Sequence, residues 1–305
     1  MKPLRIVFMG TPEFAVPCLE ALVAAGKQVV GVVTAEDKPQ GRGQKAGISA
    51  VKECALKHGL KVLQPSKLKS PEFIHELNLL QADLQIVVAF RMLPEVVWAM
   101  PRFGTFNLHA SLLPKYRGAA PINWAIINGE KETGVTTFFL QHEIDTGNII
   151  FQESEPIYVN DTVGSLYERL MMRGANLVLK TVQAIENGSA PNQPQVWDGT
   201  APHAPKIFKE TCEMDWNKRG EQLVNFVRGL SPYPAAWAKL NAKSYKVFKV
   251  SNITAIATEA IGSIKTDGKT FLNVRCADGW ISIEEFQPDG KKRMKVDEFF
   301  RGNKI

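Results

Sequence analysis

The chain is 305 residues long, with 45% hydrophobic and 22% charged residues and a formal net charge of +6. Because a single core stops growing at roughly 250 to 300 residues, this length favours two domains, and the composition is that of a folded protein. The apolar runs fall far short of the ~20 residues that span a bilayer, and the N-terminus enters a strand pattern directly, so we expect a cytoplasmic protein with no membrane segment.

In chain order, the first part alternates apolar strand patterns with amphipathic helical stretches, which predicts crossover connections and a parallel sheet. Strand patterns lie at residues 4–10, 28–35, 84–90, 104–110 and 134–140. Between the first two, Phe14, Leu19, Leu22 and Val23 form one apolar stripe, and Gly26 ends the helix. A longer helix is predicted from Val163 to Asn187. These elements predict a doubly wound α/β domain over residues 1–189.

Residues 190–205 are rich in proline, glycine and small polar residues, and we interpret them as an interdomain linker. A further helical stretch at 217–229 precedes short alternating strands with Asp-Gly pairs at 267, 278 and 289. Asp-Gly suits tight type I′ hairpin turns, so the spacing predicts an antiparallel meander. Residues 206–305 are therefore expected to form a small OB-fold-like β-barrel, with an SH3-like barrel as the alternative.

Charge is divided unevenly between these parts. Residues 206–305 hold 18 Lys and Arg against 12 Asp and Glu, whereas residues 1–205 hold 19 of each. A neutral body with a basic appendage suggests a polyanionic partner, most simply a nucleic acid, and an ordinary soluble surface is the alternative. The four cysteines form no CxxC pair, so we expect reduced thiols and no metal site.

The candidate chemistry lies at the end of the strand pattern 104–110. Ligands of open parallel sheets bind beyond the carboxyl ends of strands, and Asn107 and His109, two residues apart, project to one face there. An amide donor beside an imidazole suits addition to a carbonyl. Ser111 lies in no nucleophile-elbow context, so the attacking group would belong to a substrate. The alternative is an ordinary core histidine.

Two loops complete the candidate site. Asp145 follows the strand pattern 134–140 and could orient His109, although Asp-Thr-Gly is also a common turn and His142 is a rival for the acid-base role. The loop at 36–47 is rich in glycine and carries Lys38, Arg42 and Lys45. It suits closure over an anion, and a solvated surface loop is the alternative. Residues 10–14 lack the GxGxxG fingerprint of a dinucleotide site.

Six segments of the chain resemble the signatures of the folate-dependent formyltransferases, and the likeness covers essentially the whole chain. The segments are NLHASLLPKYRGAAPINWAI from Asn107, HEIDTGNI from His142, GTPEFAVPCLEAL from Gly10, DKPQGRGQK from Asp37, KIFKETCEMDWN from Lys206 and GLSPYPAAWAKL from Gly229. One departure is the run from Phe90 to Pro94, which is one residue shorter than the family pattern.

The resemblance implies a Rossmann-like formyltransferase domain and transfer of a formyl group from 10-formyltetrahydrofolate to the α-amine of methionine esterified to initiator tRNA, without a metal. The nucleophile is then the amine of the substrate. The residues that match the catalytic motif of the family are Asn107, His109 and Asp145. Those implied to line the folate are Ser111, Leu112, Leu113, Pro114, Phe90 and Leu93. Those implied to meet tRNA are Lys38, Arg42, Lys45, Lys206 and Lys209.

Two rival functions share parts of this pattern. A formyltransferase acting on a small amine, such as glycinamide ribonucleotide or an amino sugar nucleotide, would need no basic C-terminal barrel. A non-enzymatic RNA-binding protein would need no intact Asn107, His109 and Asp145. We expect a monomeric enzyme that acts on tRNA.

Overall fold

A computed structural model describes residues 3–40, 45–197 and 199–305, with the backbone alone for residues 38–40, 45 and 46. By their contacts the residues form two compact units: unit 1 comprises 1–117, 134–155 and 167–202, and unit 2 comprises 118–133, 156–166 and 203–305. The division into residues 1–189, 190–205 and 206–305 stays a prediction, because compactness does not measure which segments fold independently.

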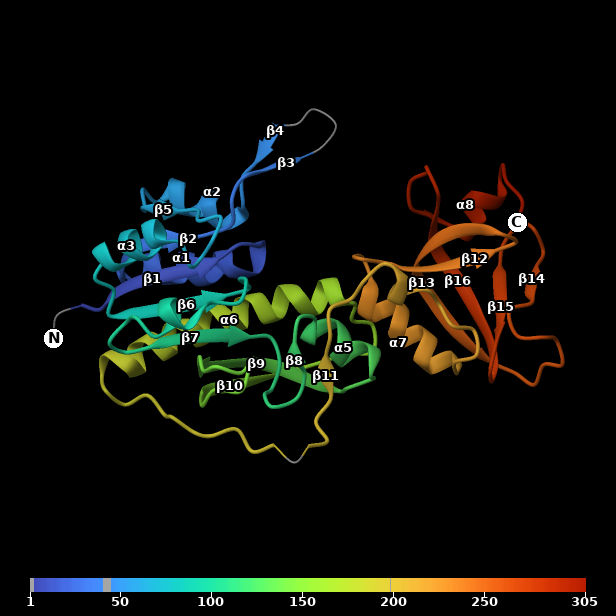
Figure 1. The fold of residues 1–305 in the computed structure, drawn as a ribbon. Coiled ribbons are helices and arrows are strands. Elements are labelled where there is room, and N and C mark those ends of the chain that lie inside the picture. Colours follow the sequence, from blue (N-terminus) through green and yellow to red (C-terminus); the bar gives the residue numbers. More distant parts are fainter. Residues whose placement is uncertain (1–2, 41–44, 198) are drawn as a thin grey trace. The chain divides into compact units, whose positions relative to one another are not determined.

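Unit 1 is built on a seven-stranded sheet in the order β10-β9-β7-β6-β1-β2-β5 (Figure 1). Its strands are β1 Arg5–Gly10, β2 Gln28–Val33, β5 Val62–Leu63, β6 Leu84–Val88, β7 Thr105–His109, β9 Glu132–Phe139 and β10 Ile149–Pro156. The five from β5 to β7 are parallel. Such strands are apolar on both faces because helices cover both, and the predicted doubly wound sheet is confirmed.

The first helices begin and end where local chemistry requires. They are α1 Val16–Ala24, α2 Ala50–Lys57, α3 Pro71–Leu79, α4 Glu95–Trp98 and α5 Pro121–Ile127. Gly26 takes a φ of +66° just after α1, a left-handed conformation that glycine adopts without strain. The hydroxyl oxygens of Ser49 and Ser70 accept hydrogen bonds from the backbone N–H of Lys52 and Phe73, which caps α2 and α3.

The two faces of the sheet bury different sets of side chains. On one face, Val7 and Met9 share a core cluster with Phe73 and Leu77 of α3. On the other, α6 Val163–Glu186 approaches β7 so closely that a Cβ at Gly174 would lie 2.6 Å from Leu108 Cδ2. The predicted long helix is confirmed, and it packs on the face opposite to the core cluster of α3.

A charge cluster joins α6 to the sheet. Glu155, 5% exposed on β10, accepts hydrogen bonds from Arg169 Nε at 2.7 Å and Arg173 Nε at 2.8 Å. Burial opposes the charge on Glu155, but these hydrogen bonds outweigh it and lower the pKa of that carboxyl. Because Arg169 and Arg173 are one helical turn apart, both reach the same carboxylate.

The direction of β9 differs from the sequence prediction. The pattern at 134–140 was expected to extend the parallel sheet, but β9 pairs antiparallel with β7, with Phe139 opposite Phe106. A parallel partner would need a crossover helix over the sheet. The helix available between these strands, α5, belongs to unit 2, so the chain returns from the opposite end.

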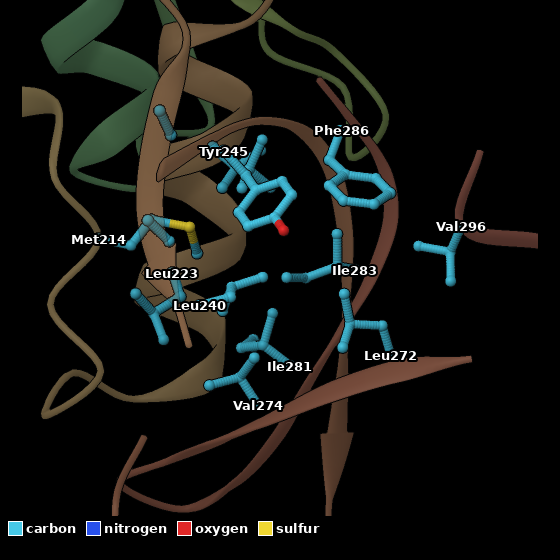
Figure 2. Close-up of a cluster of buried hydrophobic side chains, with 14 of the residues drawn as sticks. Met214, Leu223, Leu240, Tyr245, Leu272, Val274, Ile281, Ile283, Phe286 and Val296 are labelled. Atoms are coloured by element: carbon cyan, nitrogen blue, oxygen red, sulfur yellow. The ribbon is translucent and has the colours of Figure 1, made fainter. Parts of the chain in front are cut away.

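Unit 2 contains an antiparallel sheet in the order β12-β13-β16-β15-β14, with β17 paired to β16 (Figure 1). The strands are β12 Ala236–Leu240, β13 Lys243–Thr254, β14 Ile264–Thr266, β15 Leu272–Cys276, β16 Gly279–Pro288 and β17 Met294–Lys295, with helices α7 Gly220–Leu230 and α8 Val296–Phe300. Tyr245, Phe286 and Leu223 lie in its buried core (Figure 2). The predicted C-terminal antiparallel β domain is confirmed.

The three Asp-Gly pairs lie in the predicted hairpins, but the predicted turn type is wrong. Thr266 pairs with Leu272 and Phe286 with Met294, so the first and third connections are longer than two residues. In the second, Cys276 pairs with Gly279, so Gly279 already belongs to the strand. Asp267 instead caps its loop, because its Oδ1 accepts from the backbone N–H of Thr270 at 2.7 Å.

Helix α5 packs against α7 within unit 2. Asn123 Nδ2 donates to the Gly229 carbonyl at 2.7 Å, and a Cβ at Gly229 would lie 2.5 Å from Ile127 Cγ1. Glycine at 229 therefore permits a close approach of two helices that are far apart in the sequence. Among the described residues, no helix has the length and apolar character needed to cross a membrane.

Candidate functional site

The end of β7 carries a polar exception in an apolar row. Asn107 pairs with Val87, which in turn pairs with Met9, so all three side chains share the face that the core cluster of α3 covers. Asn107 is half-buried, and the described residues give its amide no hydrogen-bond partner. By alternation, His109 points to the same face, as predicted. An amide donor and an imidazole thus stand side by side.

The imidazole of His109 is held from two sides. Its Nε2 lies 2.8 Å from the carbonyl oxygen of Tyr116, and its Nδ1 lies 3.8 Å from Oδ2 of Asp145. Since a carbonyl only accepts, Nε2 carries a proton, and a proton on Nδ1 would face the carboxylate. The ring is 6% exposed, so its orientation is set by these partners. The alternative prediction of an ordinary core histidine accounts for the bond to the Tyr116 carbonyl and leaves the carboxylate of Asp145 unexplained.

Asp145 reaches His109 through a folded-back loop. Because β9 is antiparallel to β7, the loop after Phe139 starts beside the amino end of β7 and must return along it. Asp145 adopts a φ of 56°, a left-handed conformation that costs energy for a residue with a side chain. At Gly147, a Cβ would lie 1.6 Å from the carbonyl oxygen of Phe139. The Asp-Thr-Gly sequence therefore serves close packing as well as a turn.

The segment from Ala110 to Tyr116 is braced from inside. Thr136 Oγ1 donates to the Ser111 carbonyl at 2.6 Å and accepts from the Leu113 N–H at 3.2 Å. Gln152 Nε2 donates to the Leu113 carbonyl at 2.9 Å, and the Ser111 hydroxyl donates to the Lys115 carbonyl at 2.7 Å. The loop is thus rigid, and the hydroxyl of Ser111 is fully buried and occupied.

The residues predicted to line a folate divide by burial. Ser111 is 0% and Leu113 3% exposed, so they support the wall from behind, whereas Leu112 and Pro114 are half-buried. Leu93 lies in the core cluster of α3, while Phe90 packs only at its edge. The half-buried residues offer apolar surface, and the buried ones do not reach solvent. The folate assignment itself stays a prediction.

The structure describes the side chains of only some of the residues predicted to contact tRNA. Arg42 lies outside the described residues, and the side chains of Lys38 and Lys45 are not described, although their backbones form the antiparallel strands β3 Lys38–Gln40 and β4 Lys45–Gly47. Lys206 and Lys209 are exposed in unit 2. Lys206 Nζ stands 5.3 Å from the centre of the Phe208 ring. Both ammonium groups are accessible to an anion.

The rival histidine occupies a different environment. The side chain of His142 is 73% exposed, and its Nε2 lies 3.5 Å from Oε1 of Glu95. Its ring meets the edge of Trp98 with centroids 5.4 Å apart. Neither Asn107 nor Asp145 is among these partners, so the described geometry groups the acid-base candidates around His109.

In the part of the chain that the structure describes, one trio of side chains has ligand atoms close enough for a metal ion. Glu20, Cys54 and His58 place these atoms within 4.8 Å of one another. Burial raises the pKa of the Cys54 thiol, and Glu20 adds to this effect, so the thiolate that a metal requires is disfavoured. All four cysteines are buried and free.

Sequence reasoning missed the polar residues that brace this site. Gln195 lies in the stretch interpreted as a linker, yet its amide contacts the loop of Asp145. Arg117 stands 4.3 Å above the Trp197 ring; burial lowers the pKa of its guanidinium, while the charge of Asp145 opposes that effect. Composition alone hides such residues because an extended, proline-containing segment has no periodicity to reveal what it contacts.

Comparison with known proteins matches the chain along nearly its whole length. Residues 4–182 match the family described as Formyl transferase, and residues 206–304 match Formyl transferase, C-terminal domain. Methionyl-tRNA formyltransferase of Bacteroides fragilis is 56% identical over 309 residues, covering 99% of this chain and 95% of that protein. Methionyl-tRNA formyltransferase of Flavobacterium johnsoniae is 50% identical over 306 residues, covering 99% and 97%.

Solved structures share the fold at lower identity. A sugar 3N-formyl transferase, WlaRD, solved with dTDP and 5-N-formyl-THF, is 22% identical with a TM-score of 0.67, covering 96% of this chain and 100% of that one. HypX from Aquifex aeolicus, solved with tetrahydrofolic acid, is 18% identical with a TM-score of 0.65, covering 98% and 48%. These likenesses support the fold alone.

Proposed function

The chain belongs to the formyl transferase family as a methionyl-tRNA formyltransferase, and we propose that it moves the formyl group of 10-formyltetrahydrofolate to the α-amine of methionine on initiator tRNA. The observation that carries the residue assignment is the imidazole of His109, held between a carbonyl and a carboxylate beside the amide of Asn107, for which the described residues provide no hydrogen-bond partner. The initiator form of the tRNA and the formyl donor are part of the proposal.

The attacking group belongs to the substrate. The hydroxyl of Ser111 is buried and donates to the Lys115 carbonyl, and the four thiols are buried, so the described residues present no activated nucleophile near His109. An amine needs no such activation once it is neutral and positioned. Attack of the amine on the formyl carbon and departure of the donor amine therefore require only proton transfer and stabilisation of negative charge.

Three side chains divide these tasks. The Asn107 amide donates to the oxygen of the formyl group, where negative charge develops as the amine attacks. His109 takes or shares the proton of the attacking amine through Nδ1, because Nε2 is committed to the Tyr116 carbonyl. It returns a proton to N10 of the donor, which leaves as its bond to the formyl carbon breaks. The carboxylate of Asp145 stabilises the protonated ring and keeps its orientation.

The site offers the apolar surfaces and the hydrogen-bond donor that a folate donor would need. When bound, the donor supplies the formyl carbon as the electrophile. The amide of Asn107 is free to donate, and Leu112, Pro114 and Phe90 expose apolar surface on elements that the braced loop and β6 hold in place. A planar pterin suits apolar walls with a few polar groups. Leu93 and Leu113 act from behind these walls.

The partner assignment rests on charge. Lys206 and Lys209 are exposed in the basic last third of the chain, and phosphate contacts dominate nucleic-acid affinity. The loop at 36–47 adds Lys38, Arg42 and Lys45. A monomeric state and a cytoplasmic location stay predictions.

The deciding measurement is formyl incorporation by the purified full chain from 10-formyltetrahydrofolate. We expect initiator methionyl-tRNA to be formylated at least about tenfold more efficiently than elongator methionyl-tRNA, because discrimination requires contacts that only the correct tRNA completes. Preferred formylation of an amino sugar nucleotide would favour the rival small-amine enzyme. Binding of tRNA without formyl transfer would favour the rival RNA-binding protein.

We expect Arg42→Ala to reduce kcat/KM for initiator methionyl-tRNA by about tenfold or more, and Arg42→Lys to be intermediate. A guanidinium binds phosphate through two parallel hydrogen bonds, which an ammonium does less well. The affinity for folate should stay within about twofold, since the folate contacts lie at other strand ends. The exposed Arg102, changed to Ala, is the control. Unchanged kcat/KM for tRNA in Arg42→Ala would contradict the tRNA contact and favour the alternative, a solvated surface loop.

A further inference from the structure

The segment after α6 runs as an extended chain beside the start of β10 (Figure 1). Gln193 and Ile149 exchange backbone hydrogen bonds of 2.7 and 3.0 Å, so this part of the chain is anchored to the sheet. Two residues later, the side chain of Gln195 is half-buried, whereas that of Gln193 is exposed. Anchoring by backbone places the amide of Gln195 at the loop that carries Asp145.

The amide of Gln195 is saturated. Its Nε2 donates to the carbonyl oxygens of Asp145 at 2.9 Å and Gly147 at 2.8 Å. Its Oε1 accepts from Arg117 Nη2 at 2.6 Å and Nε at 3.1 Å. A glutamine amide has two donor hydrogens and two acceptor lone pairs, and all four are used here. Neither asparagine, which is shorter, nor glutamate, which lacks the donors, could repeat this set.

The bridge joins the two segments that hold His109. Arg117 directly follows Tyr116, whose carbonyl accepts from His109 Nε2, and the other side of the amide holds the backbone of Asp145, whose carboxylate faces Nδ1. Asp145 is in a strained left-handed conformation, which surrounding contacts must offset. The guanidinium of Arg117 is in turn covered by Trp197 of the same segment.

We propose that Gln195 is a positioning residue that sets the distance between the carboxylate of Asp145 and the imidazole of His109 by tying the loop 145–147 to Arg117. The inference rests on the proposed function of His109 and Asp145. It assigns the side chain of Gln195 a part in catalysis, in a segment whose other part is to connect α6 to the rest of the chain. Misplacement of a catalytic group by about 1 Å can cost on the order of 100-fold in rate.

The test is a double-mutant cycle in the full chain, with Gln195→Ala and Asp145→Asn measured singly and together. We expect Gln195→Ala to lower kcat about 10- to 100-fold, with KM for tRNA and folate within about twofold. In the Asp145→Asn background the same change should lower kcat by less than about threefold, because no carboxylate is left to place. The matched control is Gln193→Ala, which removes an exposed amide from the same segment and should leave kcat unchanged.

The failures are distinguishable. If Asp145→Asn itself has near-normal kcat, the proposed role of Asp145 fails and the inference falls with it. If Asp145→Asn has a low kcat, the proposed function stands. The positioning role is then overturned if Gln195→Ala leaves kcat unchanged, changes only KM, or lowers kcat by the same factor in the Asp145→Asn background as in the parent. Thermal unfolding of each variant separates a folded, slow enzyme from an unfolded one, and Gln195→Asn, which keeps the amide, provides a milder second variant.

Discussion

Replacing His109 by alanine is expected to lower kcat for formyl transfer by at least ~100-fold, the scale of losing a general acid-base group. The ring is buried between the Tyr116 carbonyl and the Asp145 carboxylate, so no other described side chain can take its place at that position. Asn107→Ala should lose a similar factor, because it removes a donor to the developing oxyanion. Affinity for tRNA should be nearly unchanged in both variants.

The matched control is His142→Ala. It removes the same side chain from an exposed site that pairs with Glu95, so kcat should stay within about twofold of the parent. Single-turnover formylation, with tRNA binding measured separately, distinguishes lost chemistry from lost docking. Near-normal turnover of His109→Ala would remove His109 from the catalytic assignment, and a collapse of His142→Ala would transfer the acid-base role to that residue.

Gly147→Ala is expected to lower kcat by about 100-fold through displacement of Asp145, on the scale of a 1 Å misplacement. The added Cβ would lie 1.6 Å from the carbonyl oxygen of Phe139, a backbone atom that cannot rotate away. The loop must therefore move off β9. Its movement breaks the hydrogen bond from Gln195 to the Gly147 carbonyl and lengthens the distance from Asp145 to His109.

Gly302→Ala controls for the added methyl group itself, because a Cβ there would meet nothing within 4 Å. Its kcat should equal that of the parent protein. Thermal unfolding of Gly147→Ala should show a folded protein, since the change is confined to a loop at the edge of the sheet. A kcat within threefold of the parent would contradict this prediction. It would mean that the loop can shift without carrying Asp145 away from His109, or that the distance between the Asp145 carboxylate and the His109 imidazole does not limit the rate.

Strand and helix placement followed from local pattern where the chain repeats a period over several residues. The strands β1, β2 and β6 were predicted because each is a short run of mostly apolar residues, β7 because polar and apolar residues alternate in it, and the stripe of α1 because its apolar residues recur at helical spacing. The direction of β9 was wrong because parallel and antiparallel strands share the same period. The turn type at Asp278 was wrong for a similar reason, since a one-residue shift of register moves glycine from the turn into the strand.

The candidate site also combines features that a local pattern predicts with features that depend on tertiary contacts. The placement of Asn107 and His109 on one face follows from their spacing on a strand, and Asp145 was singled out by its position after the strand pattern 134–140 and then by the resemblance to the family. Asp145 was predicted as a partner of His109. The Tyr116 carbonyl on Nε2 and the contact of Gln195 with the loop of Asp145 did not follow, because these loops meet only through the packing of the whole unit. Leu93 was assigned to the folate wall, yet its side chain lies in the core cluster of α3.

By itself, the sequence determined the α/β class of the first part, the antiparallel β domain at the end, the basic charge of the last third and the family. Each of these resides in composition or in residues close along the chain. Only the tertiary structure decided that β9 returns antiparallel, that His109 is held by a carbonyl and a carboxylate, and that Gln195 of the apparent linker braces the loop of Asp145. The strand pairing of Phe106 with Phe139 and the ion pair of His109 with Asp145 join residues more than 30 positions apart, and the hydrogen bonds of Gln195 join residues 50 and 78 positions apart, which no local period records.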